Sequence, residues 1–307
     1  MAEFTLTILG SNSAVPAHDR YPSAQFLKHK QSSFLIDCGE GTQFQLNKYH
    51  IKRGNLNHIF ISHMHGDHYF GLVGLLNSFK LNNRQHELHI YGPSELDAII
   101  RLQADYTDAQ WPYPIFFHPH SFEGVDMLME NDSIRVHSIP LKHKIPCNGF
   151  LFREKPKLRK IVASSMEKYG VHHEEILAIK KGGDFVAASG EVIANALLTE
   201  DSSPSYSYAY CSDTMYDDEL VQYVQGVDVL YHEATFKSDS EDKALLRFHS
   251  TARQAALIAK AANVGQLIIG HYSAKYKNLD ELLTEAREIF PNTELALEGK
   301  VFDIPAC

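Results

Sequence analysis

The sequence reads Ser62-His63-Met64-His65-Gly66-Asp67-His68 directly after the apolar segment His58 to Ile61. That segment is typical of a β-strand, and a turn at the end of a strand can aim closely spaced side chains at one point. Three imidazoles and one carboxylate are ligands that zinc accepts. The stretch therefore predicts a metal site, and it is dense enough for two ions.

Composition narrows the class of protein. The chain has no run of the ~20 apolar residues that a membrane-spanning helix needs, so a membrane protein is excluded. Its first residues lack the basic and apolar regions of a signal peptide, which favours a cytoplasmic protein. The four cysteines form no C-x-x-C pair, so neither a disulfide framework nor a thiolate zinc site is expected. A net charge of −9 argues against a polyanionic partner unless positive charge is concentrated locally.

Strand patterns alternate with helical patterns in both halves of the chain. The predicted strands are Phe4 to Leu9, Ser33 to Asp37, His58 to Ser62, Glu87 to Tyr91, Ser133 to Ile139, Tyr208 to Cys211, Val227 to Tyr231 and Gln266 to Ile269. The predicted helices are Gly71 to Leu81, Glu95 to Ala104, Asp218 to Gln225, Thr251 to Ala262 and Leu279 to Ile289. Two strand-rich halves with interspersed helices predict an α/β layered domain.

The interval from about residue 152 to 200 interrupts this alternation. It includes a basic run in which Arg153, Lys157, Arg159 and Lys160 are candidates to contact phosphates. We expect a single domain over residues 1–307, with an arm inserted at about 152–200.

The pattern His-x-His-x-Asp-His resembles the hallmark of the metallo-β-lactamase superfamily. The resemblance implies an α/β fold, the αβ/βα four-layer sandwich, with further ligands at the ends of later strands. The implied ligand sets are His63, His65 and His143 for one zinc and Asp67, His68 and His271 for the other, with Asp213 bridging them. Such a pair of ions stabilises the attacking and leaving oxygens of an in-line displacement at phosphorus. Manganese or iron also suits a His/Asp site.

Other stretches are similar to the RNase Z family of that superfamily. They are Ile8 to Pro16, Leu35 to Gln43, His65 to Leu76, Tyr231 to Thr235, His249 to Thr251 and His271 to Tyr276. By this resemblance Asp67 orients the attacking water and takes its proton, while His249, held by Glu233, protonates the leaving 3′ oxygen. Candidate substrate-binding residues are Arg20, Ser273, Lys275 and Tyr276.

The resemblance also implies a reaction and an assembly. The reaction is zinc-dependent endonucleolytic cleavage of precursor tRNA 3′ of the discriminator nucleotide. It leaves a 3′-hydroxyl on the tRNA and a 5′-phosphate on the trailer. The implied assembly is a homodimer in which the arm of one subunit reaches tRNA at the active site of the other.

Two stretches depart from the family pattern. The loop from Pro16 to Tyr21 keeps Pro16 and Arg20 of the family's P-x-K-x-R-N pattern but has His18 and Tyr21 in place of Lys and Asn. The arm also lacks the family's Gly-Pro signature. These departures favour an alternative, a phosphodiesterase or hydrolase of the same fold that acts on a small molecule.

A further alternative is a zinc-stabilised nucleic-acid-binding module without catalysis. Structural zinc sites use four protein ligands, whereas the set implied here needs a water to complete it. The pairing of His249 with Glu233 argues for a catalyst, and in particular against a generic small-molecule hydrolase.

Overall fold

The structure is a computed structural model that describes residues 3–106 and 111–305. The chain divides into two compact units, one formed by Met1–Arg153 with Tyr206–Cys307 and the other by Glu154–Ser205. Within the described ranges, no helix combines the length and apolar character that a bilayer span requires. The cysteines Cys38, Cys147 and Cys211 are buried free thiols, and Cys307 lies outside the described residues.

The larger unit contains two sheets, each with seven strands in the described part of the chain. The first runs β18-β1-β2-β3-β4-β5-β6, with β1 (Phe4–Gly10), β2 (Ala24–His29), β3 (Ser32–Ile36), β4 (Leu56–Phe60), β5 (Leu88–Gly92), β6 (Ile115–Pro119) and β18 (Val301–Asp303). The second runs β17-β16-β15-β14-β9-β8-β7, with β7 (Met127–Glu130), β8 (Ile134–Leu141), β9 (Cys147–Glu154), β14 (Ser207–Cys211), β15 (Val229–Glu233), β16 (Gln266–Gly270) and β17 (Thr293–Leu295).

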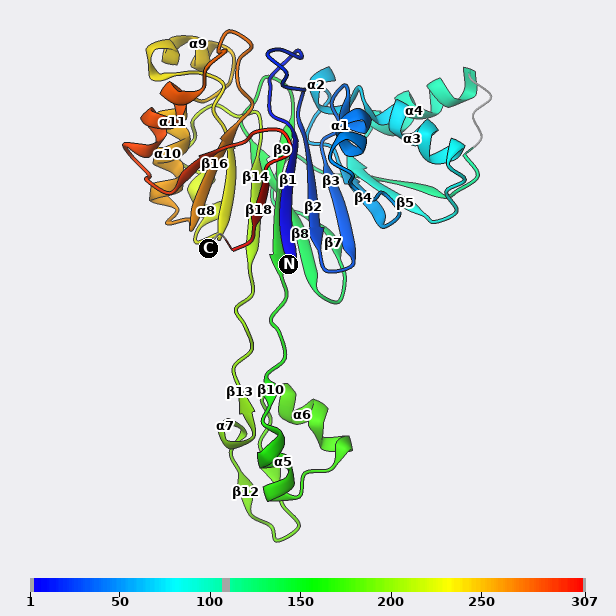
Figure 1. Ribbon diagram of the computed structural model, residues 1–307, viewed down its shortest axis with the longest axis vertical. Helices are drawn as coiled ribbons and strands as arrows, with labels where there is room; N and C mark the ends of the chain where they lie inside the picture. The colour runs from blue at the N-terminus through cyan, green and yellow to red at the C-terminus, as the bar shows by residue number, and fades with distance from the viewer. Residues whose placement is uncertain (1–2, 107–110, 306–307) are drawn as a thin grey trace. The chain divides into compact units, whose positions relative to one another are not determined.

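Helices cover the outer face of each sheet (Figure 1). The first sheet carries α1 (Thr42–Lys48), α3 (Leu72–Leu81) and α4 (Glu95–Tyr106), and the one-turn helix α2 (Gly66–Tyr69) follows β4. The second carries α8 (Leu220–Val224), α10 (Ala252–Ala261) and α11 (Asp280–Arg287), and η2 (Ser238–Ser240) and α9 (Glu241–Leu246) precede α10.

Three apolar clusters hold these layers together, because the central strands of each sheet, such as β4 and β15, bury both of their faces. In β4, Ile59 packs outward against the helices while Phe60 packs inward between the sheets. On the second sheet, Leu230 packs outward and Tyr231 inward. The layer order is therefore helix, sheet, sheet, helix, which confirms the predicted four-layer sandwich.

Every strand and helix predicted from the sequence is present, with ends displaced by a few residues. The strands β2 and β9 are among those that were not predicted. Gly149 interrupts the apolar pattern of β9, yet a Cβ atom there would lie 2.3 Å from the Tyr210 carbonyl oxygen. The glycine is needed because β14 approaches closely at this point.

The smaller unit has its own fold. It consists of the strand pairs β10 (Lys160–Ile161) with β13 (Thr199–Glu200) and β11 (Phe185–Val186) with β12 (Val192–Ile193), and of α5 (Ala163–Tyr169), η1 (His173–Glu175), α6 (Ile176–Lys180) and α7 (Asn195–Leu198). A small cluster of Ile179, Phe185, Ile193 and Leu198 forms its core. The Asn195 amide donates to the carbonyls of Ile179 and Gly183, which ties helix α7 to the turn after α6.

Candidate metal centre and acid–base pair

The seven candidate metal ligands lie just beyond the carboxyl ends of strands from both sheets. Four of them, His63, His65, Asp67 and His68, follow β4, and the others, His143, Asp213 and His271, follow β8, β14 and β16. The carboxyl ends of parallel strands meet at one edge of a sheet, where α/β proteins characteristically build their sites. The sandwich therefore gathers residues from His63 to His271, which are far apart in the sequence.

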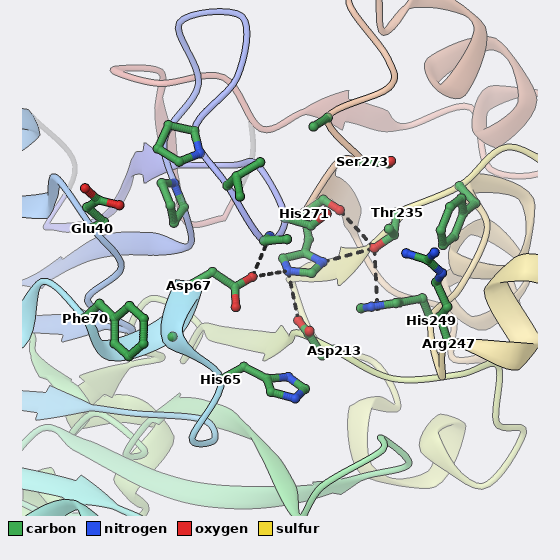
Figure 2. A pocket seen from close by; sticks show the side chains of 18 residues that line it. Glu40, His65, Asp67, Phe70, Asp213, Thr235, Arg247, His249, His271 and Ser273 are labelled. Carbon is green, nitrogen blue, oxygen red and sulfur yellow. Dashed lines mark hydrogen bonds and ion pairs between the residues drawn. The ribbon is translucent and has the colours of Figure 1, made fainter. Parts of the chain in front are cut away.

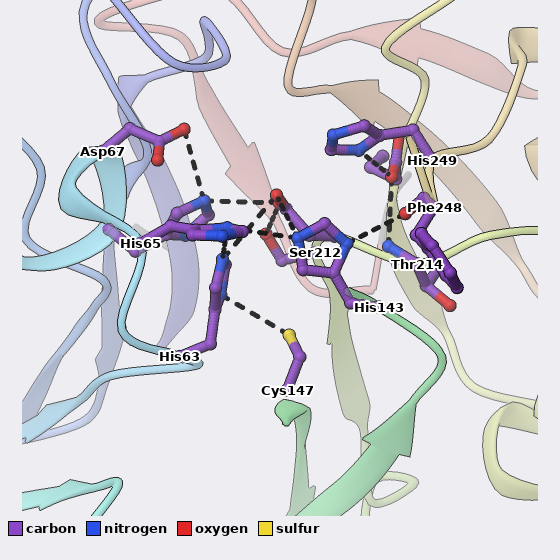
Figure 3. A network of polar contacts seen from close by, with 12 residues as sticks. His63, His65, Asp67, His143, Cys147, Ser212, Thr214, Phe248 and His249 are labelled. Atoms are coloured by element: carbon purple, nitrogen blue, oxygen red, sulfur yellow. Dashed lines mark hydrogen bonds and ion pairs between the residues drawn. The ribbon is translucent and has the colours of Figure 1, made fainter. Parts of the chain in front are cut away.

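A first group of four side chains brings its ligand atoms together. Figure 3 shows three of them, His63, His65 and His143, turned toward one another. His65 Nδ1 lies 2.9 Å from His63 Nε2 and 3.1 Å from His143 Nε2. The Asp213 carboxylate completes the group, with Oδ2 at 3.8 Å from His63 Nε2 and 3.6 Å from His143 Nε2. Three imidazole nitrogens and one carboxylate oxygen converging in this way suit a zinc ion.

A second group adjoins the first and shares Asp213 with it. Asp67 Oδ2 lies 3.6 Å from His68 Nε2 and 3.5 Å from His271 Nε2. Asp213 Oδ1 lies 3.3 Å and 3.2 Å from the same two nitrogens. Because one oxygen of Asp213 faces each group, its carboxylate has the geometry of a bridging ligand.

The hydrogen bonding of the second group fits a metal ion. The Nε2 atoms of His68 and His271 are buried and have no hydrogen-bond partner among the described residues. The Nδ1 atoms, in contrast, have partners: His68 Nδ1 lies 2.7 Å from Asp37 Oδ2, and His271 Nδ1 lies 3.0 Å from Thr235 Oγ1. With Nδ1 engaged in this way, Nε2 is the atom of each ring that faces the group, and it can bind a metal that displaces its proton.

The electrostatics of the same group favour a positive charge at its centre. Burial disfavours the charged form of His68, but Asp213, Asp67 and Asp37 outweigh it and raise the pKa of His68 well above its usual value. Burial likewise opposes ionisation of Asp67, and His68 and His271 nevertheless hold the pKa of Asp67 well below its usual range. A cluster that stabilises a cationic ring in this way will also stabilise a bound cation.

Asp37, at the end of β3, anchors the ring of His68 and was not singled out from the sequence. Its carboxylate is fully buried and accepts from His68 Nδ1, the Ser62 backbone and hydroxyl, and the Tyr210 hydroxyl. A carboxylate behind a metal-binding histidine fixes its tautomer and orientation. The available signal was a carboxylate directly after the apolar strand segment Leu35 to Ile36.

We expect Asp37→Asn to lower metal affinity by ~10–100-fold, the usual loss when such a supporting partner is changed. The amide keeps the shape of the carboxylate but cannot fix the Nδ1–H of His68. Competition with a chromogenic chelator measures the affinity, and circular dichroism checks the fold. Asp19→Asn, on an exposed loop residue, is the control. Unchanged affinity in a folded Asp37→Asn protein would contradict this role.

The half-buried His249 and the buried Glu233 form an acid–base pair beside the metal groups. His249 Nδ1 lies 2.7 Å from Glu233 Oε1, and the other carboxylate oxygen of Glu233 accepts from the hydroxyl and backbone of Thr235. Burial opposes the charge on the ring, but Glu233 outweighs it and raises the pKa of His249 to about 9. Glu233 therefore favours the protonated ring, which is the form able to donate a proton.

The metal groups and the acid–base pair open onto one cleft of about 740 Å³ (Figure 2). Its lining includes Asp67, Asp213 and His271, together with His249. The remaining lining residues come mainly from three segments, the loop around Ser13 to Pro16, the turn after the metal-binding loop at Phe70, and the loop at Ser273. A cleft of this size and chemistry is the expected place for a substrate.

Comparisons with known proteins agree with this geometry. The chain is 44% identical over 304 residues to a ribonuclease Z from Bacteroides thetaiotaomicron, with 99% of this chain and 96% of the relative covered. The chain belongs to the ribonuclease Z family. The crystal structure of human tRNase Z, short form, matches with a TM-score of 0.71 and 26% identity, covering 98% of this chain and 99% of that one.

Two further matches bear on the fold. The metallo-β-lactamase fold protein YhfI from Bacillus subtilis superposes with a TM-score of 0.68 at 19% identity over 98% of this chain and 99% of that one. A family model described as anti-Pycsar protein Apyc1 matches residues 4–155. The fold is that of the metallo-β-lactamases, and membership of the ribonuclease Z family makes the chain a hydrolase of the endoribonuclease class.

Arg20, predicted to bind substrate, is buried in a loop contact. Only 7% of the residue is exposed, and its guanidinium donates to the carbonyls of Tyr276 and Lys277 and to Asn12 Oδ1. It is not among the described residues that line the cleft. This side chain therefore braces the loop at Pro16 to Tyr21 against the segment after His271, and its contact with substrate stays a prediction.

The other candidates after His271 differ in their access to the cleft. Ser273 lines it. Lys275 Nζ contacts Ser240 Oγ at 2.9 Å and lies over the rings of Phe236 and Tyr276. The Tyr276 hydroxyl accepts from the Lys237 backbone. Lys275 and Tyr276 thus hold the cleft wall together.

The basic run at the start of the smaller unit is partly neutralised. Lys157 pairs with Glu154 at 2.9 Å, and Arg159 pairs with Asp201. Across Glu154–Ser205 the sequence has seven Lys and Arg against eight Asp and Glu. The smaller unit as a whole therefore has no excess of positive charge, and the basic groups free to meet a phosphate are single exposed residues such as Lys160.

Proposed function

We propose that the chain is a zinc-dependent endoribonuclease that cleaves precursor tRNA 3′ of the discriminator nucleotide, leaving a 3′-hydroxyl on the tRNA and a 5′-phosphate on the trailer. The observation that carries the proposal is the His249–Glu233 pair at 2.7 Å, opening onto the same cleft as the metal-ligand candidates. A nucleoside 3′-oxyanion is a poor leaving group, so its departure benefits from a positioned proton donor.

In this proposal the residues divide the work. His63, His65, His143, Asp67, His68, His271 and the bridging Asp213 hold two zinc ions, with manganese or iron as substitutes. Bound ions would supply charge stabilisation for the attacking and leaving oxygens at phosphorus. Asp67 orients the attacking water and takes its proton, and its Oδ2 is itself fixed by the Ala14 backbone N–H at 2.7 Å. His249 gives its proton to the 3′ oxygen on the other side of the phosphorus.

The decisive experiment compares two substrates in metal-analysed protein. A precursor tRNA with a defined trailer should be cut once, after the discriminator nucleotide, with the end groups named above. Efficient hydrolysis of bis-p-nitrophenyl phosphate without cleavage of the precursor would favour the alternative, a small-molecule phosphodiesterase of the same fold. Binding of RNA without turnover of either substrate would favour a non-catalytic module.

The smaller unit, in this proposal, is an inserted arm that grips tRNA through its basic run. Changing Arg153, Lys157, Arg159 and Lys160 together to glutamine should weaken precursor-tRNA binding. It should also make the slope of log affinity against log salt concentration shallower by roughly one for each phosphate that the arm no longer neutralises. Because Lys157 and Arg159 already have carboxylate partners, the slope should change by less than the full value for all the substituted residues. Filter binding at several salt concentrations measures it.

A charge-matched control separates this local effect from net charge. It changes four exposed lysines of the larger unit, Lys28, Lys52, Lys243 and Lys260, to glutamine. The control should leave the salt slope near that of the unmodified protein. Hydrolysis of bis-p-nitrophenyl phosphate, which is too small to reach an arm, should change little in either protein. Equal slopes in the two variants would show that the basic run does not bind tRNA.

Family membership also supports two coarser proposals. The chain acts in the cytoplasm, where precursor tRNA is processed, and it assembles as a homodimer in which the arm of one subunit serves the other. Light scattering coupled to size exclusion gives the assembly. Mixing a His249→Ala subunit with an arm-neutralised subunit tests the exchange, because activity should reappear only if arm and active site come from different chains.

A further inference from the structure

One exposed aromatic ring in the cleft has no role in the proposed chemistry. Phe70 is 65% exposed, although it follows the metal-binding loop directly and lines the cleft. A large apolar side chain left open inside a polar site loses the benefit of burial unless a ligand covers it. The ring is therefore a surface on which part of a substrate could rest.

The ring of Phe70 is held in place by its own loop. Gly66 has no side chain, and a Cβ atom there would lie 2.2 Å from Phe70 Cε2, so the ring rests directly on the Gly66 backbone. Tyr69 packs edge-on against it, with ring centroids 5.0 Å apart. A ring fixed in this way, with one side free, is a ready platform on which a nucleobase can stack.

The two ends of the cleft differ in charge. Phe70 and Glu40 line one end, whereas His249 and Arg247 line the other, with Asp67 and His271 between them (Figure 2). Arg247 is exposed and forms no ion pair with any described residue. A phosphate is therefore attracted to the Arg247 end and repelled from the Glu40 end, which leaves the Phe70 end to an uncharged group such as a base.

We propose that this asymmetry sets the direction of the RNA across the cleft: the first trailer base stacks on Phe70, and the tRNA strand leaves past Arg247. The inference rests on the proposed function, because His249 protonates the 3′ oxygen that stays on the tRNA. The tRNA side of the scissile phosphate must then lie at the His249 end. The trailer nucleotide, on the remaining oxygen of that phosphate, lies at the Phe70 end.

The test is a double-mutant cycle in which one change is made in the protein and the other in the substrate. Phe70→Ala should lower kcat/KM on precursor tRNA by about 5- to 150-fold, the range found when a base is deprived of its aromatic partner. Removing the base of the first trailer nucleotide should lower kcat/KM of the unmodified protein by a similar factor. The two changes together should lower kcat/KM little more than either alone, since both remove the same interaction. Phe70→Trp should retain activity on the normal substrate.

A spectroscopic signal and a matched variant complete the experiment. With 2-aminopurine as the first trailer base, its fluorescence should be quenched on mixing with the unmodified protein, before cleavage, and much less with Phe70→Ala. Arg247→Gln should instead reduce the salt dependence of binding. It should lower kcat/KM by the same factor whether or not that base is present. Additive losses for Phe70→Ala and the abasic substrate, with unchanged quenching, would overturn the inference. A lack of cleavage by the unmodified protein would instead refute the proposed function.

Discussion

His63→Ala is expected to release metal and to abolish hydrolysis of every phosphodiester substrate. His63 Nε2 lies 2.9 Å from His65 Nδ1 and faces Asp213, so its loss leaves the first group with too few ligands to hold an ion. Metal ions contribute several kcal/mol to such displacements, which corresponds to a loss on the order of 10³-fold or more. Precursor tRNA and bis-p-nitrophenyl phosphate should be affected alike.

Metal content is the independent measurement. Protein purified without chelator should carry up to two ions per chain by elemental analysis, and His63→Ala fewer. His86→Ala, which removes an exposed imidazole far from any ligand group, should keep both metal and turnover. Full turnover in a His63→Ala protein that has lost its metal would refute the metal mechanism for this chain.

The sequence predicted those features whose cause is local. The ligands after β4 fall within six positions, and the strands and helices follow from apolar spacing along the chain, so both were readable without a structure. Asp37 supports His68 from another strand, and Phe70 gains its significance from a cleft assembled by several loops. Interactions between distant segments leave no periodic pattern, which is why these two residues were missed.

Arg20 shows the same limit. Its position in a loop similar to a family motif predicts a substrate contact, but nothing in the sequence indicated that its guanidinium also donates to the carbonyls of Tyr276 and Lys277. Burial disfavours its charged form and lowers the pKa of Arg20, although Glu298 acts in the opposite sense. A buried guanidinium persists where several acceptors satisfy it, and here those acceptors belong to the protein itself.

His249→Ala should cut precursor tRNA slower by ~10²–10⁴-fold, the contribution usual for a positioned proton donor, while retaining its metal. The polar contacts of the ring are made by Nδ1, which lies 2.7 Å from Glu233 Oε1 and 3.4 Å from Thr235 Oγ1. It is not needed for either of the two ligand groups proposed here. Removing it therefore separates proton donation from metal binding, which elemental analysis verifies.

The leaving group decides what the slower cleavage means. A p-nitrophenolate departs without a proton, so bis-p-nitrophenyl phosphate should be hydrolysed by His249→Ala at a rate much closer to that of the unmodified protein. Glu233→Gln should show the same contrast more mildly, because an amide still contacts the ring but no longer raises the pKa of His249. If hydrolysis of both substrates slowed equally with metal intact, His249 would be acting on a step common to both reactions rather than on the leaving group. The small-molecule hydrolase would then become the better account of this site.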